Sequence, residues 1–121
     1  MIQAPFNIDW ESFNENLDND REIITEIIRL FLASAPGKMS EVKAAILKMD
    51  ASAIEHAAHS LKGAIAAFGT VDVVNVAQTI ENEGREKTLN NLGTLCTNLE
   101  NLLMVLTLHL EDKLIEWEQA G

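Results

Sequence analysis

The chain has 121 residues, of which 47% are hydrophobic, and only six are Gly and two Pro, which excludes a disordered or loop-dominated protein. This length supports one domain, residues 1–121, with a real core. The formal net charge of −10 at pH 7 disfavours binding to nucleic acid or to an anionic membrane, because both need clustered Lys and Arg. We interpret the acidity mainly as a source of solubility.

The first residues and the single cysteine bear on the compartment. The chain begins Met-Ile-Gln-Ala-Pro without a basic segment followed by an apolar one, so we expect no signal peptide. No apolar run approaches the length of a bilayer span. Cys96 falls on an apolar helix position, where we expect a small core residue. These features together predict a cytoplasmic protein.

Strand signals are sparse, and the predicted class is all-α. The run of valines at residues 71–76 is ambiguous, but its flanks favour a helix. After an extended lead, Asp9 could cap a short helix that ends near Asn16, with Trp10 and Phe13 on one side. We interpret this helix as a lid whose aromatic rings cover one end of a bundle. Exposed docking aromatics are the alternative.

A long apolar pattern follows, with Asp20 or Asn19 as its cap. Pro36 and Gly37 should end a helix, yet the apolar spacing keeps the same phase across them. We therefore predict one helix over residues 20–48, kinked at Pro36, with two separate helices as the alternative.

Three more helical segments are expected in the second half of the chain. Asp50 would cap a helix over residues 51–68, with Gly69 as its stop. Thr70 would cap the next helix, and the polar residues 82–87 would form the following turn. Thr88 would open the last helix, which runs to about Glu118.

Such short links require neighbouring helices to lie antiparallel. The predicted fold is an antiparallel up-down-up-down four-helix bundle with a short N-terminal helix across one end.

One stretch of the third segment is unusual for a core helix. It reads His-Ser-Leu-Lys-Gly-Ala-Ile-Ala-Ala-Phe-Gly over residues 59–69. At roughly 100° per residue, His59 lies about 200° from the apolar Leu61, on the outer face. Lys62 follows three residues later, and Gly63 and Ala66 add almost no bulk beside the ring. A histidine on the solvent-facing side of a core helix, next to a cation and small residues, needs an explanation.

The same stretch resembles the signature of the histidine-containing phosphotransfer (HPt) domain family, His-x-Leu-Lys-Gly followed by small residues and a glycine. The matching residues are His59, Leu61, Lys62, Gly63, Ala64, Ala66, Ala67 and Gly69. The helical patterns before and after the stretch also fit this family, so the resemblance covers nearly the whole chain.

The resemblance implies a phosphorelay carrier of two-component signalling. Nε2 of His59 would accept a phosphoryl group from a receiver-domain aspartate or a sensor kinase and pass it to another receiver. The partners would be response-regulator receiver domains or a hybrid sensor histidine kinase, and the Mg²⁺ would be held by the receiver. The carrier itself would need no cofactor and no metal, and we expect a monomer.

The residue types suit that chemistry. Unperturbed imidazole is mostly neutral near pH 7 and needs no separate base. Lys62 should favour the neutral ring by like-charge repulsion and then pair with the phosphoryl oxygens. Small side chains at Gly63 and Ala66 leave room for a partner, and Ser60, Glu55 and His56 lie on or beside the same docking face.

One position departs from the family pattern. Relatives often use a Gln of the following helix to orient the histidine through Nδ1, and the corresponding position here is Glu81. A carboxylate would hold the Nδ1 proton more tightly and favour the charged ring, opposing Lys62. Gln78 lies nearby, and the sequence leaves the choice between the two open.

Two other functions compete with the carrier. A receiver-binding adaptor would need no histidine. A metal-binding bundle could use Glu55, His56 and His59, but two histidines and one carboxylate on an exposed face form a weak site. An autonomous kinase is disfavoured, because the sequence has no glycine-rich nucleotide-binding loop. We therefore predict a phosphoryl carrier and not an enzyme.

Overall fold

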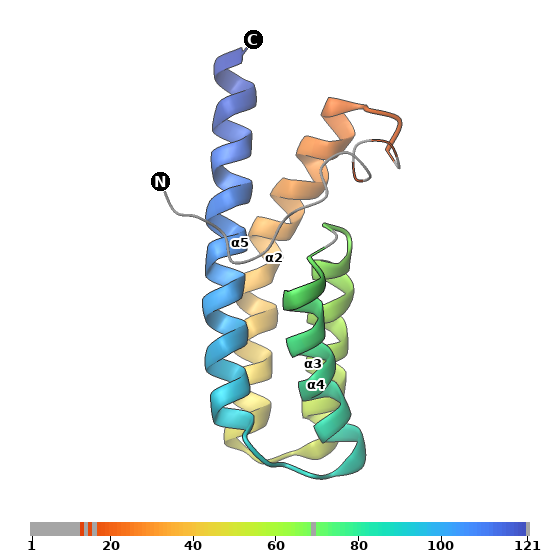
Figure 1. The fold of residues 1–121 in the computed structure, drawn as a ribbon, viewed down its shortest axis with the longest axis vertical. Coiled ribbons are helices and arrows are strands. Elements are labelled where there is room, and N and C mark those ends of the chain that lie inside the picture. Colours follow the sequence, from red (N-terminus) through yellow and green to blue (C-terminus); the bar gives the residue numbers. More distant parts are fainter. Residues whose placement is uncertain (1–12, 14, 16, 69, 121) are drawn as a thin grey trace.

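The computed structural model describes residues 13, 15, 17–68 and 70–120, which form an all-α structure. Its helices are α2 (Arg21–Leu47), α3 (Ala51–Ala66), α4 (Val71–Glu86) and α5 (Leu92–Ala120). Each helix packs against two others, in the pairs α2–α3, α3–α4, α4–α5 and α2–α5. Figure 1 shows consecutive helices running in opposite directions, with α2 and α5 extending above the shorter α3 and α4. The predicted helical-bundle class is confirmed.

Side-chain caps fix two of the helix starts, at the residues that the sequence indicates. Asp20 accepts hydrogen bonds from the backbone N–H groups of Glu22 and Ile23, at 3.0 and 3.2 Å. Asp50 accepts one from Ala53, at 3.2 Å. Each bond satisfies an N–H group that has no partner within its own helix.

The segment around Pro36 is one helix and not two. Pro36 lies inside α2, and the apolar positions on both sides of it, from Phe31 to Met39, are buried. In Figure 1 the N-terminal part of α2 leans away from α5, whereas its C-terminal part runs beside it, as expected of a helix bent by an interior proline. Burial of one continuous stripe outweighs the missing hydrogen bond.

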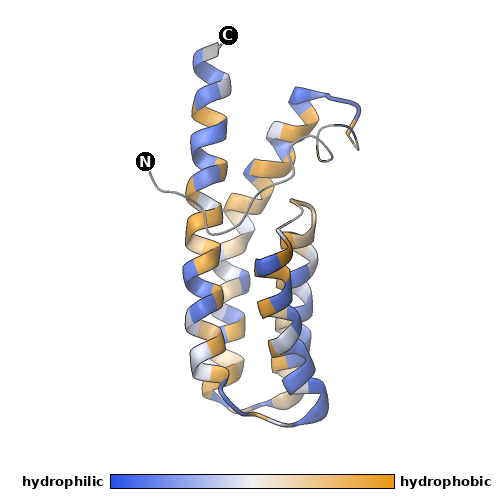
Figure 2. Ribbon diagram, viewed as in Figure 1, coloured by the Kyte–Doolittle hydropathy of each residue, from blue (hydrophilic) through white to orange (hydrophobic). Residues whose placement is uncertain are grey.

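The core lies along the bundle axis. Figure 2 shows apolar and polar residues alternating along the helices, as expected of helices that bury one face. Ile28 and Val42 of α2, Leu61 of α3, Ile80 of α4 and Leu106 of α5 are all fully buried. Cys96 is only half-buried, so the expectation of a core residue is wrong, and it lies at the rim of the core. Within the described residues, no helix is both long and apolar enough to cross a membrane.

Aromatic rings close one end of the core. Phe13 is buried, and its ring centroid lies 5.2 Å from that of Phe68, which lies 5.1 Å from that of Phe31. This packing agrees with the predicted lid as far as Phe13 is concerned. Trp10 and most of the predicted N-terminal helix lie outside the described residues.

Some predicted boundaries differ from the observed ones. The polar residues 82–86 continue α4 and do not form a turn; the helix ends where Lys87 adopts a left-handed conformation, with φ of 59°. The last helix therefore begins at Leu92 and not at Thr88. Thr70 precedes α4 as predicted, but its side chain makes no capping hydrogen bond. The helix predicted over residues 51–68 ends at Ala66, and Gly69, its predicted stop, lies outside the described residues.

Helices α3 and α4 approach each other closely at Gly84. A Cβ atom at Gly84 would lie 2.7 Å from the backbone N of Glu55 and 2.8 Å from the backbone O of Ala51. These partners are backbone atoms, which cannot swing away as a flexible side chain would. Gly84 therefore sets the spacing of α3 and α4.

We expect Gly84→Ala to lower the free energy of unfolding by about 2 kcal/mol, because the added methyl group must push two backbones apart. Urea denaturation would measure the loss. Gly37→Ala is the matched control, since a Cβ atom there would meet no atom within 4 Å. In the control, alanine should stabilise the helix by roughly 0.5–1 kcal/mol. Equal stability of the two variants would contradict the close approach at Gly84.

Candidate functional site

His59 lies on the outer face of α3, as predicted. Its side chain is 69% exposed. The residues on the opposite face of the same helix, Ala58, Leu61 and Ile65, are fully buried. The packing of α3 therefore turns the imidazole away from the core and leaves it accessible to another molecule.

A carboxylate from α4 holds one nitrogen of this ring. Nδ1 of His59 lies 2.7 Å from Oε1 of Glu81, whose side chain is only 2% exposed. A carboxylate only accepts hydrogen bonds, so Nδ1 carries the proton in this contact. In a neutral ring the lone pair is then on Nε2. Between the two residues that the sequence left open, Glu81 contacts His59.

Glu81 is also the centre of a wider polar cluster. Lys62 Nζ lies 3.1 Å from its Oε1 and 3.2 Å from its Oε2. Arg85, one turn later on α4, donates from Nη2 to Oε2 at 3.0 Å. Gln78 donates from Nε2 to Oε2 at 3.3 Å and accepts from Lys62 Nζ at 2.8 Å. The buried carboxylate is thus well supplied with donors, as a buried charge must be.

The cluster sets the protonation of Glu81. Burial by itself would raise the pKa of Glu81, but hydrogen bonds from Lys62 and His59, together with their charges, hold this pKa below its ordinary value. Glu81 is therefore ionised near neutral pH.

The structure locates the remaining predicted site residues around His59. His56 and Ala66 are exposed. Gly63 is also exposed, and a Cβ atom there would meet nothing within 4 Å. The chain's own packing therefore does not require a glycine at this position. Glu55 is paired with Arg85, whose Nε lies 2.9 Å from its Oε2.

Two cations of the site were not singled out from the sequence. Arg85 bridges Glu55 and Glu81, and the i, i+4 spacing from Glu81 to Arg85 is a sequence signal for this pair. Lys38 of α2 donates from Nζ to Oγ of Ser60 at 2.7 Å. No spacing rule predicts that second contact, because it joins two helices.

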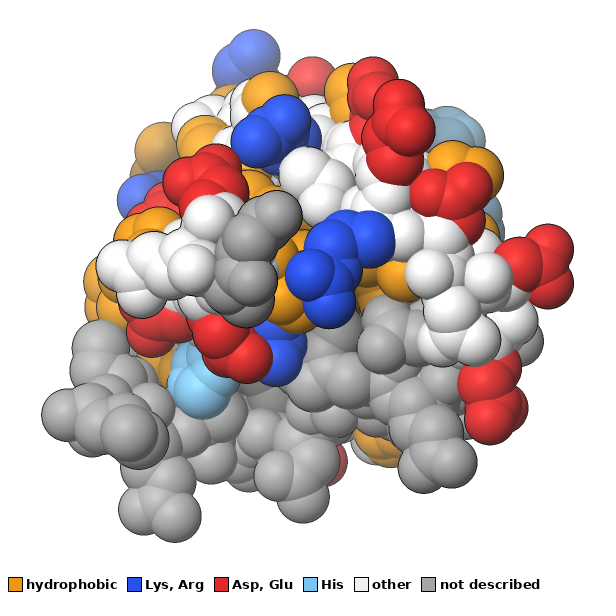
Figure 3. Space-filling view, turned by 90° about the horizontal axis from the view of Figure 1, so that it is seen from above, with side chains coloured by type: hydrophobic (Ala, Val, Ile, Leu, Met, Phe, Trp, Pro, Cys, Tyr) orange, Lys and Arg blue, Asp and Glu red, His pale blue; other side chains and the backbone are white. Residues whose placement is uncertain are grey.

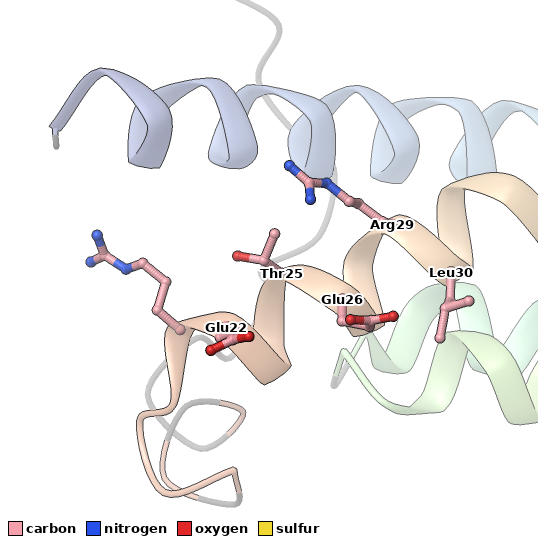
Figure 4. Close-up of a pocket in the computed structure, with 6 residues that line it drawn as sticks. Glu22, Thr25, Glu26, Arg29 and Leu30 are labelled. Atoms are coloured by element: carbon pink, nitrogen blue, oxygen red, sulfur yellow. The ribbon is translucent and has the colours of Figure 1, made fainter.

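Two other features of the described surface differ from the surroundings of His59. The hollow drawn in Figure 4 is lined by residues of the first turns of α2, with Arg29 and Leu30 at its far end. Seen along the bundle axis, acidic and basic side chains are interspersed (Figure 3). Among the described residues, no three or more His, Cys, Asp or Glu side chains are arranged to hold a metal ion. The geometry thus gives no support to the metal site considered for Glu55, His56 and His59.

The lowered pKa of Glu81 makes a prediction about stability and pH. Such a carboxylate stabilises the fold above its unfolded-state pKa, near 4.5, and this contribution is lost as the pH falls through the folded-state pKa. We expect Glu81→Gln to be less stable than the unmodified protein by about 1–3 kcal/mol at pH 7, and the difference to shrink below pH 4.5.

Urea denaturation at a series of pH values would measure both free energies. Glu100→Gln is the control, because Glu100 pairs with Lys43 at a half-exposed surface position. Exposed pairs contribute little, so this variant should stay close to the unmodified protein. A Glu81→Gln difference that does not depend on pH would contradict the ionised cluster.

Comparisons with known proteins bear on the fold and on the family of the chain. Histidine-containing phosphotransfer protein B (HptB) from Pseudomonas aeruginosa PAO1 superposes with a TM-score of 0.82, at 20% identity over 92% of this chain and 96% of that one. The HPT domain from the Hpt sensor hybrid histidine kinase of Shewanella gives a TM-score of 0.75, at 19% identity over 90% and 94%. At these identities both likenesses show the fold. No curated protein matches the chain.

The family model described as Hpt domain matches residues 26–120. This match covers all of α3, α4 and α5 and most of α2, including the exposed His59 and the buried Glu81. The chain therefore belongs to the Hpt domain family, whose members are phosphocarriers that interact with receiver domains and histidine kinases in two-component signalling.

Proposed function

We propose that this protein carries a phosphoryl group on Nε2 of His59, which it accepts from a receiver-domain aspartate or a sensor kinase and passes to another receiver. The observation that carries the proposal is the contact between the exposed imidazole and the buried Glu81, 2.7 Å long at Nδ1. It leaves Nε2, the nitrogen that faces away from the carboxylate, as the nucleophile.

The transfer itself requires little from the bundle beyond positioning. The Nε2 lone pair forms a bond to phosphorus, the bond from phosphorus to the aspartyl oxygen breaks, and the carboxylate leaves with its electron pair. Such transfers depend on in-line approach and on stabilisation of the phosphoryl oxygens. The orientation of the ring favours in-line approach, because Glu81 and the α3 backbone hold the ring in place.

Lys62 would contribute to stabilising the phosphoryl oxygens. In the unphosphorylated protein its ammonium group is bound to Glu81 and Gln78, and its side chain is 20% exposed. A phosphoryl group on the neighbouring turn brings new anionic oxygens, with which an ammonium group pairs strongly. We infer that Lys62 stays bound to Glu81 and Gln78 of α4 until the ring is phosphorylated, and then pairs with the phosphoryl oxygens.

The small residues of the outer face would receive the partner. Gly63 and Ala66 leave the backbone of α3 open beside His59, and Ser60, Glu55 and His56 border this surface. Mg²⁺ would come with the receiver domain. The lack of a cofactor of its own, the monomeric state and the cytoplasmic location stay predictions from the sequence.

Labelling tests the site assignment. Incubation with a panel of phosphorylated receiver domains should label the unmodified protein with acid-labile phosphate, and His59→Gln should take no label. His56→Gln is the matched control, since His56 is exposed one turn away. It should still take the label, because Nε2 of His59 stays in place, even if a change beside the docking surface slows the reaction. Label that persists in His59→Gln would refute the site. Receiver binding by an unmodified protein that never takes the label would indicate an adaptor.

The open backbone at Gly63 makes a separate prediction. Gly63→Ala should raise the free energy of unfolding by roughly 0.5–1 kcal/mol, because alanine favours helices and its Cβ would meet no packing partner within 4 Å among the described residues. The same methyl group should slow phosphotransfer from a receiver domain at least several-fold, because it stands where the partner approaches.

Gly93→Ala provides the control for that experiment. Gly93 is equally open, but it lies in the first turn of α5, which packs against α2 and α4 and is diagonal to α3. Its substitution should leave the transfer rate unchanged. Transfer by Gly63→Ala at the unmodified rate would mean that partners do not approach over this part of α3.

A further inference from the structure

The contact between Glu81 and His59 has a consequence for the phosphorylated protein, and the inference rests on the proposed carrier function. We propose that Glu81 keeps the proton on Nδ1 after Nε2 is phosphorylated, so that this carrier releases its phosphoryl group readily and does not store it. Glu81 thus acts as a positioning residue for a proton and does not touch the transferred group.

The argument begins with the charge that phosphorylation creates. When the Nε2 lone pair attacks phosphorus, the Nδ1 proton stays in place and the ring becomes an imidazolium. Loss of that proton would leave a lone pair on Nδ1 facing Oε1 of Glu81, 2.7 Å away. A carboxylate has no hydrogen to offer such a lone pair, so two acceptors would face each other. The contact therefore favours the protonated phosphoimidazole.

A glutamine at this position would behave differently. Its amide has an oxygen that accepts and an NH₂ group that donates, and a rotation of the amide exchanges them. It could accept from the protonated ring and donate to the deprotonated one. Only the carboxylate, which bonds the ring with its Nδ1 proton and not the ring without it, favours one of these two states over the other.

Glu81 cannot easily change its own role. Lys62, Arg85 and Gln78 hold both of its oxygens, and its side chain is almost fully buried. The cluster also lowers the pKa of Glu81, so the carboxyl does not protonate near neutral pH and become a donor to Nδ1. The acceptor at Nδ1 is therefore permanent.

Charges around the ring do not reverse this preference. On α3 and α4 the cations Lys62 and Arg85 are balanced by the carboxylates Glu81 and Glu55. On α2, Lys38 is bound to the hydroxyl of Ser60. The other titratable group near the ring on α3 is the exposed His56. With the ion pairs balanced, the direct hydrogen bond at Nδ1 decides which state is favoured.

The protonation state of the ring controls cleavage of the P–N bond. When this bond breaks, the ring nitrogen takes the bonding electron pair. A protonated ring leaves as neutral imidazole, whereas a deprotonated ring must leave as an imidazolide anion, which is a far poorer leaving group. A carrier that stays protonated to higher pH therefore transfers its phosphoryl group faster, to a receiver aspartate or to water.

Hydrolysis of the isolated phosphoprotein tests the proposal without any partner. Phosphoramidate would phosphorylate the unmodified protein and Glu81→Gln, with His59→Gln identifying label on other histidines. Phosphate release would be followed from pH 6 to pH 10. We expect the pH at which the rate has fallen by half to be about one unit higher for the unmodified protein than for Glu81→Gln. At pH 9 it should lose its phosphate several-fold faster.

The ¹⁵N chemical shift of Nδ1 in the phosphorylated proteins reports the Nδ1 proton directly. In each protein it should change over the same pH range as the hydrolysis rate. Glu55→Gln is the matched control, because this carboxylate shares Arg85 with Glu81 and makes no hydrogen bond to His59. Loss of its charge leaves Arg85 less well balanced, so its pH profile should move to lower pH, but by clearly less than that of Glu81→Gln. A shift equal to that of Glu81→Gln would show a general effect of charge and would overturn the role of the hydrogen bond.

If Glu81→Gln does not fold, as judged by circular dichroism, Arg85→Gln serves instead. This variant keeps the carboxylate and removes one of its cations, so its profile should move to higher pH or stay unchanged, and a move to lower pH would overturn the proposal. Identical profiles for the unmodified protein and a folded Glu81→Gln would also overturn it. In that case normal labelling of His59 by receivers would leave the carrier function standing, whereas failure of that labelling would count against the carrier function itself.

Discussion

The close approach of α3 and α4 at Gly84 is the constraint on which the site depends. With no side chain at this position, the backbone of α4 lies directly against that of α3 near Ala51 and Glu55. Glu81, one turn earlier on α4, then comes within 2.7 Å of the ring of His59. A wider separation would deprive the buried carboxylate of its two partners on α3, His59 and Lys62, at a cost of several kcal/mol. The same contact thus supports both the packing and the chemistry.

The site also shows how a buried charge is kept in a small bundle. Glu81 has His59, Lys62, Gln78 and Arg85 as partners, and each of them reaches outward to solvent or to another polar group. The carboxylate is therefore ionised although it is buried. Its fixed charge lies beside an exposed ring and holds the Nδ1 nitrogen of that ring, which leaves Nε2 free.

Much of this could be predicted from the sequence because it depends on local rules. The apolar spacing of three and four residues identified the helices, and Asp20 and Asp50 marked two of their starts. The unbroken phase across Pro36 correctly indicated one helix. The angle between His59 and Leu61 placed the imidazole on the outer face. Local rules failed where polar residues were interpreted as a turn, since a mostly polar last turn of a helix, here residues 82–86, has the same composition as a loop.

Contacts between helices could not be predicted from local rules. The sequence left the partner of Nδ1 undecided between Glu81 and Gln78, and it gave no sign that Lys38 would meet Ser60. From the sequence, Gly84 could belong either to the apolar face of its helix or to the turn that follows, and only the structure shows it where two backbones touch. Periodicity specifies which face of a helix is buried, but the distance and the relative rotation of two helices follow from how their side chains interlock. Only the assembled bundle could therefore assign Glu81 to His59 and tie Lys62 to α4.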